Sequence, residues 1–203
     1  MPYSPYVPIP IGSLAWGTPV NNAFQELDET LQTFPQDHGL MYWQFDPATN
    51  MVGSTITSGT VSMSKLWIRR AMTVTNLAVS VATVGVTLTA GQNFLGLYDA
   101  TGTRLGVTAD QTASWGTTGY KQAALTVPVA VAAGPYWVAV LSNAATTPAF
   151  ARGSALVASI ANPNLTATDG RFTTGPAAQT TMPANIVMAS RTLSGNTIWT
   201  ALG

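Results

Sequence analysis

"LYDATGTRL", residues 97–105, decides the fold class, because it joins two short apolar runs through a tight turn. The linking Asp-Ala-Thr-Gly sequence is typical of a hairpin loop, in which Gly102 can adopt the positive φ that such a turn needs. Strands joined in this way pair antiparallel. The stretch therefore predicts an antiparallel sheet with a hairpin at its centre.

The same pattern of short apolar runs separated by turn residues extends to both sides of this hairpin. From Gly39 onward, β-branched and aromatic runs alternate with turn residues, which is typical of strands. Gly134-Pro135 predicts a second antiparallel connection, and residues 143–182 read as long loops with at most two weak strands. The runs predict seven or eight strands, covering 60–70, 72–88, 93–99, 104–108, 120–127, 136–142 and 196–202.

Many short strands without intervening helices predict an antiparallel β-sandwich or jelly-roll-like domain over residues 36–203, in a chain that is mainly β. We expect the two inner faces of this domain to bury apolar residues of the predicted strands. These are Leu77, Val79, Val81, Leu95, Leu97, Trp137, Val140 and Trp199.

One α-helix is predicted before the β-rich region, over residues 18–35. Thr18 can cap it, Pro19 suits its first position, and Pro35 ends the pattern. Because so short a helix is marginally stable alone, its apolar seam must be buried, either on the chain's own β-domain or, as we favour, against other copies. The seam has coiled-coil spacing and consists of Val20, Phe24, Leu27, Leu31 and Phe34.

Residues 1–17 have a third pattern, because prolines recur every two or three residues from Pro2 to Pro10. This spacing favours an extended polyproline-like arm without internal hydrogen bonds, and we expect the arm to dock on a neighbouring protein. The predicted docking residues are Pro2, Tyr3, Pro5, Tyr6, Pro8 and Pro10.

Composition narrows the function classes. Charged residues make up 8% of the 203 residues, and the eight basic and eight acidic residues cancel. We therefore expect no nucleic-acid partner, and no apolar run approaches the ~20 residues that span a membrane. The chain has no cysteine, which excludes disulfides and thiolate metal sites. We expect no cofactor and no metal.

No catalytic motif accompanies the reactive side chains. His38, the one histidine, lies at the junction of helix and sandwich, and we interpret it as a linker residue. Asp99, Asp110 and Asp169 could supply a glycosidase pair, but their turn-like contexts favour local hydrogen bonds to backbone N–H groups. We therefore expect no enzymatic activity and no catalytic residues.

Four aromatic residues could stack on sugar rings if they are exposed: Tyr42, Trp43, Trp67 and Trp115. Trp115 is the first candidate for a ligand contact, because it lies in the polar stretch "DQTASWGTTGY", residues 110–120. Packing in the core or in a subunit interface is the alternative for all four.

Three stretches resemble minor tail proteins of bacteriophages that infect actinobacteria, a group of tailed-phage virion proteins. They are "WGTPVNNAFQELDETL" (16–31), "LTAGQNFLGLYDATGTRLGVTADQTASW" (88–115) and "GPYWVAVLSNAATTPAFARG" (134–153). The resemblance implies an N-terminal attachment segment and an outward β-domain, often trimeric, in a virion assembled in the host cytoplasm.

We therefore expect as partners other copies of the chain, other virion proteins reached through the arm, and a host cell-surface glycan. The proline-rich first ten residues depart from the usual pattern and leave placement on the tail or the capsid open. A capsid decoration protein or head fibre is therefore the alternative function, and a carbohydrate-active enzyme module is a third.

Overall fold

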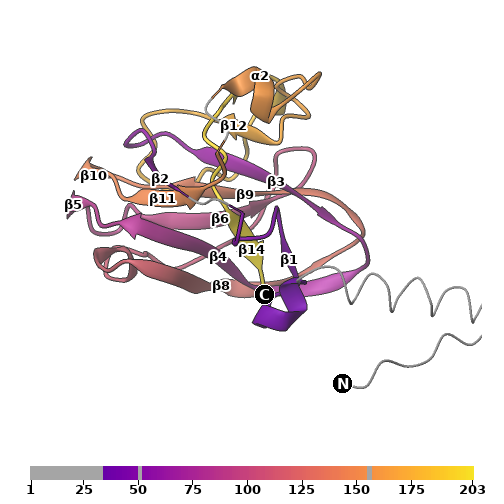
Figure 1. Cartoon of the computed structure of the whole chain (residues 1–203), viewed down its shortest axis with the longest axis horizontal. Coiled ribbons are helices and arrows are strands. Elements are labelled where there is room, and N and C mark those ends of the chain that lie inside the picture. Colours follow the sequence, from indigo (N-terminus) through magenta and orange to yellow (C-terminus); the bar gives the residue numbers. More distant parts are fainter. Residues whose placement is uncertain (1–33, 50–51, 155–156) are drawn as a thin grey trace, which may run out of the picture.

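The computed structural model describes residues 34–49, 52–154 and 157–203 (Figure 1). These residues are mainly β, with two antiparallel sheets of six strands each, a separate two-stranded pair and very little helix. The prediction of a mainly antiparallel β fold is confirmed. The helical elements are the 3₁₀ turns η1 (Pro35–His38), η2 (Ser114–Gly116) and η3 (Met188–Ser190), and α2 (Ala158–Ala161).

The first sheet is built around the long strand β4. One edge of β4 pairs with β8, and its other edge pairs with β14 and then with β11 along its length. Outside these lie β1, which pairs with β14, and β2, which pairs with β11. The strands are β1 (Tyr42–Trp43), β2 (Val52–Thr55), β4 (Met72–Thr83), β8 (Gly119–Val131), β11 (Ala149–Arg152) and β14 (Thr200–Leu202).

The second sheet has the order β13-β12-β3-β9-β6-β7, with every neighbouring pair antiparallel. Its strands are β3 (Ser62–Ile68), β6 (Phe94–Tyr98), β7 (Arg104–Val107), β9 (Gly134–Leu141), β12 (Phe172–Thr174) and β13 (Thr192–Leu193). A short separate pair, β5 (Val86–Leu88) with β10 (Ala144–Thr146), lies at one end of the molecule (Figure 1).

The hairpin predicted from residues 97–105 is present as β6 and β7. Gly102 has a φ of +89°, as the turn requires, and its N–H donates to the Asp99 carbonyl at 3.1 Å. The Asp99 carboxylate accepts the Thr101 and Thr103 N–H groups at 2.9 and 3.0 Å and the Thr101 hydroxyl at 2.7 Å. The carboxylate therefore organises the turn from inside.

Burial on its own would raise the pKa of Asp99, but these hydrogen bonds outweigh it and lower the pKa below the ordinary value of an aspartate. The charged carboxylate therefore contributes its full stabilisation at pH values above the ordinary pKa of an aspartate. This stabilisation is lost as the pH falls through the lowered pKa. Asp99→Ala should lower the free energy of unfolding by about 1–2 kcal/mol at neutral pH and by much less in strong acid. Urea unfolding at both pH values checks this, and Asp99→Asn, which keeps one acceptor oxygen, should lose less. An equal loss at both pH values would contradict the role of the charged form.

The second predicted connection, at Gly134-Pro135, does not join paired strands. β8 ends at Val131 in the first sheet and β9 begins at Gly134 in the second, so the chain crosses between sheets here. The chain also crosses between β3 and β4, and these two crossings are adjacent because Ile68 pairs with Gly134 and Met72 with Val131. The turn at Gly134-Pro135 was predicted correctly. The prediction that it joins two paired antiparallel strands was wrong, because β8 and β9 lie in different sheets.

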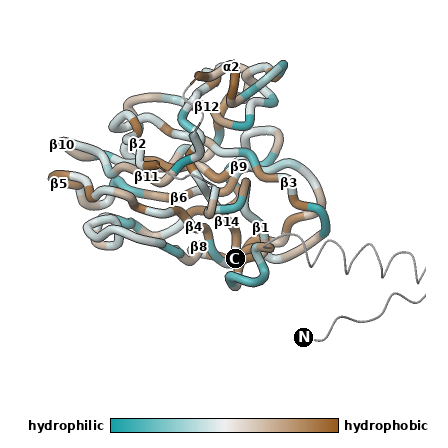
Figure 2. The backbone as a smooth tube through the Cα atoms, viewed as in Figure 1, coloured by the Kyte–Doolittle hydropathy of each residue, from teal (hydrophilic) through white to brown (hydrophobic). Residues whose placement is uncertain are grey.

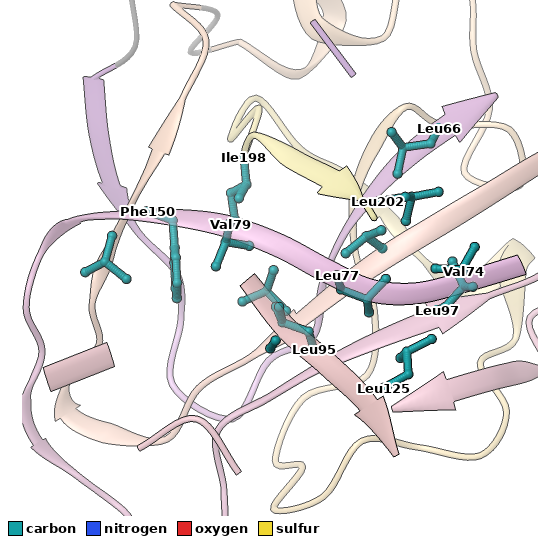
Figure 3. Packing of buried hydrophobic residues seen from close by; sticks show 14 of the residues in the cluster. Leu66, Val74, Leu77, Val79, Leu95, Leu97, Leu125, Phe150, Ile198 and Leu202 are labelled. Carbon is teal, nitrogen blue, oxygen red and sulfur yellow. The ribbon is translucent and has the colours of Figure 1, made fainter. Parts of the chain in front are cut away.

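A single large apolar cluster is shared by the two sheets (Figure 3). Leu77, Val79 and Val81 of β4 face Leu95 and Leu97 of β6 within it, and all five are at most 1% exposed. Because this cluster draws on strands of both sheets, the arrangement is sandwich-like. These five positions and Val140 were predicted correctly as core.

Two further clusters cover the outer faces of the sheets. Trp137 is buried in one of them, under the segment that carries Met182, Ile186 and Met188, and Trp199 lies in the other, with Leu40. Both tryptophans were predicted to be buried, and they are, but not between the sheets. Strand alternation explains the difference, because Val138 and Ile198, their immediate neighbours in the chain, occupy the inner face.

Hydrophobic stretches follow the strands, and hydrophilic ones lie mainly at the connecting loops (Figure 2). The loop region predicted for 143–182 contains β10, β11, β12 and α2, more regular structure than expected. The run 72–88 is two strands, because the chain leaves the sheet after Thr83 and re-enters strand at Val86.

The predicted arm of residues 1–17 and the predicted helix up to residue 33 lie outside the described residues. Phe34 is described, and its backbone is extended, with φ −100° and ψ 154°. A helix cannot continue through a residue in this conformation. The expectation that the helix includes Phe34 and Pro35 is therefore wrong, and Pro35 instead begins the separate turn η1.

Candidate functional site

Three of the four aromatic residues singled out in the sequence line one surface groove. Tyr42 and Trp43 form β1, and Trp67 lies near the end of β3. The groove has a volume of about 480 Å³ and is completed by residues of the loop between α2 and β12. We call it the Trp67 groove. Its lining residues are Tyr42, Trp43, Gln44, Lys65, Leu66, Trp67, Arg69, Leu165 and Arg171.

Strand alternation presents the groove side chains. Leu66 and Ile68 of β3 point into the shared core, so Lys65 and Trp67 project from the opposite, outer face. Trp67 is 56% exposed, which is unusual for so large an apolar side chain. The Lys65 ammonium lies 6.0 Å from the centroid of the Trp67 ring. The Trp67 indole and the Lys65 ammonium therefore lie close together on the outer face of β3.

Hydrogen bonds fix the floor of the groove. The Tyr42 hydroxyl accepts the Arg69 backbone N–H at 2.9 Å, which ties β1 to the end of β3. The Gln44 side-chain amide donates to the Lys65 carbonyl at 3.3 Å, and its oxygen accepts the Thr200 N–H at 3.2 Å. Lys65 and Thr200 belong to different sheets. Gln44 therefore bridges the two sheets directly beneath the groove.

The loop that supplies Arg171 is anchored by a buried cation. Arg191 is 4% exposed and donates to the Thr168 carbonyl at 2.6 Å and to the Thr173 hydroxyl at 3.1 Å. Burial lowers the pKa of Arg191 to about 10, although nearby Asp169 opposes this change. The guanidinium thus remains protonated at neutral pH and holds the loop against the sheet.

Trp137 forms the centre of this anchor. Lys65 and Arg191 each lie 4.9 Å from its ring centroid, and its indole N–H donates to the Gly170 carbonyl at 3.0 Å. Cations over an indole are attracted by the negative face of the ring. Burial lowers the pKa of Lys65, while Asp169 raises it and Arg191 lowers it further. The lysine is therefore held in place by the tryptophan and by the Asp169 carbonyl, which it contacts at 3.2 Å.

A second, smaller hollow of about 290 Å³ also has Trp43 in its lining. His38 lines it, with its ring centroid 5.4 Å from that of Trp43, together with Tyr120 and Trp199. His38 lies in η1, at the edge of the β-domain, as the linker interpretation expected. The hollow is mostly apolar.

Trp115, the first candidate for a ligand contact, is completely buried, with 0% exposure. It belongs to η2, its ring meets that of Phe150 edge-on at 5.0 Å, and both lie in the shared core. The polar residues around it suggested an exposed loop, but the short turn directs the indole inward to fill the end of the core. This placement contradicts the predicted ligand contact.

The three aspartates that could have supplied a glycosidase pair, Asp99, Asp110 and Asp169, lie on three separate loops. Asp110 accepts the Asn93 N–H at 3.1 Å and the Thr112 hydroxyl at 3.0 Å, much as Asp99 serves its own turn. Burial would raise the pKa of Asp110, but these hydrogen bonds lower it overall. A glycosidase general acid needs the opposite shift. Asp169 lies in the loop beside the Trp67 groove, where its carbonyl accepts Lys65.

Four polar or charged groove residues were not singled out in the sequence: Gln44, Lys65, Arg69 and Arg171. A usable signal exists for two of them, because Lys65, Trp67 and Arg69 alternate in "KLWIRR" and so share one strand face. Arg171 carries no such local signal. It reaches the groove because its carbonyl accepts the Lys65 N–H at 2.7 Å, a contact between segments far apart in the chain.

Within the described part of the chain, no group of three or more histidine, aspartate or glutamate side chains is placed to hold a metal ion. No helix formed by the same residues is long and apolar enough to cross a membrane. Comparisons with protein-family models and with curated proteins found no match to the chain.

Proposed function

We propose that the chain is a structural protein of a tailed-phage virion, of the minor tail type, whose β-domain binds a glycan on the host surface. The sequence resemblance supports the assignment to a virion. The observation that carries the binding role is the exposed indole of Trp67 in a groove with Tyr42 and Trp43. Aromatic faces of this kind bind sugar rings by stacking.

The proposal includes a non-enzymatic role. Asp99 and Asp110 have lowered pKa values, and their carboxylate oxygens accept hydrogen bonds from nearby N–H and hydroxyl groups. Carboxylates committed in this way are poor general acids. These contacts favour a binding module over a carbohydrate-active enzyme.

The finer architecture belongs to the same proposal. Residues 1–17 dock as an extended arm on a neighbouring virion protein, and residues from 18 onward form the helix that joins subunits, with a trimer favoured. The sandwich-like domain then has a jelly-roll-like connectivity and projects from the particle. A capsid decoration protein or head fibre would use the same parts, and labelling the arm on intact particles distinguishes the two placements.

Light scattering of the full chain tests the assembly step. We expect an oligomer, and we expect a double variant, Phe24→Ser with Leu27→Ser, to be a monomer because the apolar seam is lost. Gln25→Ser, between the two seam positions, is the matched control and should leave the oligomer intact. A stable, monodisperse monomer of the unmodified chain would contradict the proposal.

A further inference from the structure

The lining of the Trp67 groove is positively charged. Lys65, Arg69 and Arg171 line it, and none of the described lining residues is acidic. The protein as a whole carries equal numbers of basic and acidic residues, so this is a local concentration of charge. Arg69 and Arg171 are both exposed. Such a concentration points to an anionic ligand.

The two arginines are free to bind a ligand. Among the described residues, none forms a hydrogen bond or an ion pair with either guanidinium group, and Arg171 only lies 5.3 Å from the ring of its neighbour Phe172. A guanidinium presents N–H donors in a planar fork that matches a carboxylate or a phosphate. The groove thus holds, beside an exposed indole, two guanidinium groups that no described residue engages through a hydrogen bond or an ion pair.

We propose that the Trp67 groove binds an acidic saccharide, with a sugar ring stacked on Trp67 and the carboxylate or phosphate of the sugar bound by Arg69 and Arg171. This inference rests on the proposed glycan-binding function and names the ligand class and its contacts. Lys65 adds a third positive charge, held beside the Trp67 ring by its contacts to Trp137 and Asp169. The groove volume of about 480 Å³ is that of a small-ligand site.

The groove is also held in shape before a ligand arrives. Gln44 fixes the floor to both sheets, and Arg191 fixes the loop that carries Arg171. A site ordered in advance loses less conformational entropy when it binds. The rigidity of the groove therefore favours a short saccharide of defined conformation over a flexible ligand to which the groove would have to adapt.

Single-stranded nucleic acid is the other ligand that uses aromatic and basic groups together. It is disfavoured because nucleic-acid-binding domains carry an extended basic surface and an isoelectric point above about 9. The isoelectric point of this chain is about 6.5, with three basic side chains in the groove. Oligodeoxythymidylate therefore serves as a competing ligand in the test.

Calorimetric titration of the full chain tests the inference. The probes are tetragalacturonic acid, its methyl ester, a mannose tetrasaccharide that carries a phosphate monoester, its dephosphorylated form and oligodeoxythymidylate. We expect at least one acidic saccharide to bind at least about 10-fold more tightly than its neutral form, and binding to weaken as salt is added. The carboxylate and phosphate probes show which anion the arginines recognise.

Variants assign the contacts. Trp67→Ala should weaken binding of the acidic saccharide at least about 10-fold, and Arg171→Gln about 5-fold with a reduced salt dependence. Lys121→Gln removes the same charge from β8, in the other sheet, and should change nothing. Equal binding of acidic and neutral forms, weakened by Trp67→Ala but unaffected by Arg171→Gln, would overturn the inference while leaving glycan binding at the Trp67 groove intact. Equal binding that neither variant changes would overturn both the inference and the glycan-binding role of the groove. Failure of every saccharide, or preferential binding of oligodeoxythymidylate, would overturn both the inference and the glycan-binding role.

Discussion

Replacing Trp115 with alanine should lower the free energy of unfolding by about 3–5 kcal/mol, one of the two largest effects that we expect of a single substitution. The indole is fully buried between the sheets, where it packs against Phe150. Alanine would leave a cavity in this closely packed core. The Trp115 indole N–H has no hydrogen-bond partner among the described residues, so the expected loss of stability comes from packing alone.

Trp67→Ala is the matched control, because it removes the same side chain from an exposed position. It should cost less than about 1 kcal/mol, as is usual for surface substitutions. Urea unfolding of both variants, followed by circular dichroism, gives the comparison. A Trp115→Ala protein as stable as the wild type, with glycan binding lost, would restore the ligand-contact interpretation and contradict the placement of Trp115 in the core.

Gly102→Ala should be destabilising by at least about 3 kcal/mol. The residue has a φ of +89°, which costs an L-amino acid energy, and a Cβ built there would overlap the carbonyl oxygen of Ile186. That carbonyl belongs to a backbone that cannot move freely, since the Ile186 N–H donates to the Gly102 carbonyl at 2.8 Å. The strain and the overlap therefore add.

Gly116→Ala is the control for Gly102→Ala. Gly116 lies at the end of η2, and a Cβ at that position would meet no atom within 4 Å. Its substitution should change the midpoint of thermal unfolding little. If both variants unfold at the temperature of the wild type, the close approach of the hairpin turn to Ile186 is wrong.

Local sequence patterns predicted the strands because each pattern has a local physical cause. Residues 97–105 carry their own turn chemistry, and β4, β6 and β9 carry apolar runs that few other structures could bury. The sheet that each strand joins depends on long-range pairing. The sequence around Gly134 therefore predicted a turn but could not show that β8 and β9 lie in different sheets.

The same distinction separates the groove residues. Tyr42, Trp43 and Trp67 were predictable as a chemical type, but whether an aromatic is exposed depends on what other segments cover it. Trp137 is covered by the segment 182–188 and Trp67 is not. The prediction that Trp115 contacts a ligand was wrong for the same reason, since the polar neighbours of Trp115 in the sequence do not reveal that the turn directs its ring inward.

The most direct test of the Trp67 groove as the ligand-binding face uses the six tryptophans of the chain as probes. The full chain is labelled with 5-fluorotryptophan, its ¹⁹F signals are assigned by single Trp→Phe variants, and it is titrated with the acidic tetrasaccharide that binds best. We predict that the signals of Trp67 and Trp43 shift with ligand concentration while that of Trp115 stays unchanged. Saturable binding that leaves the Trp67 signal unmoved would contradict the account.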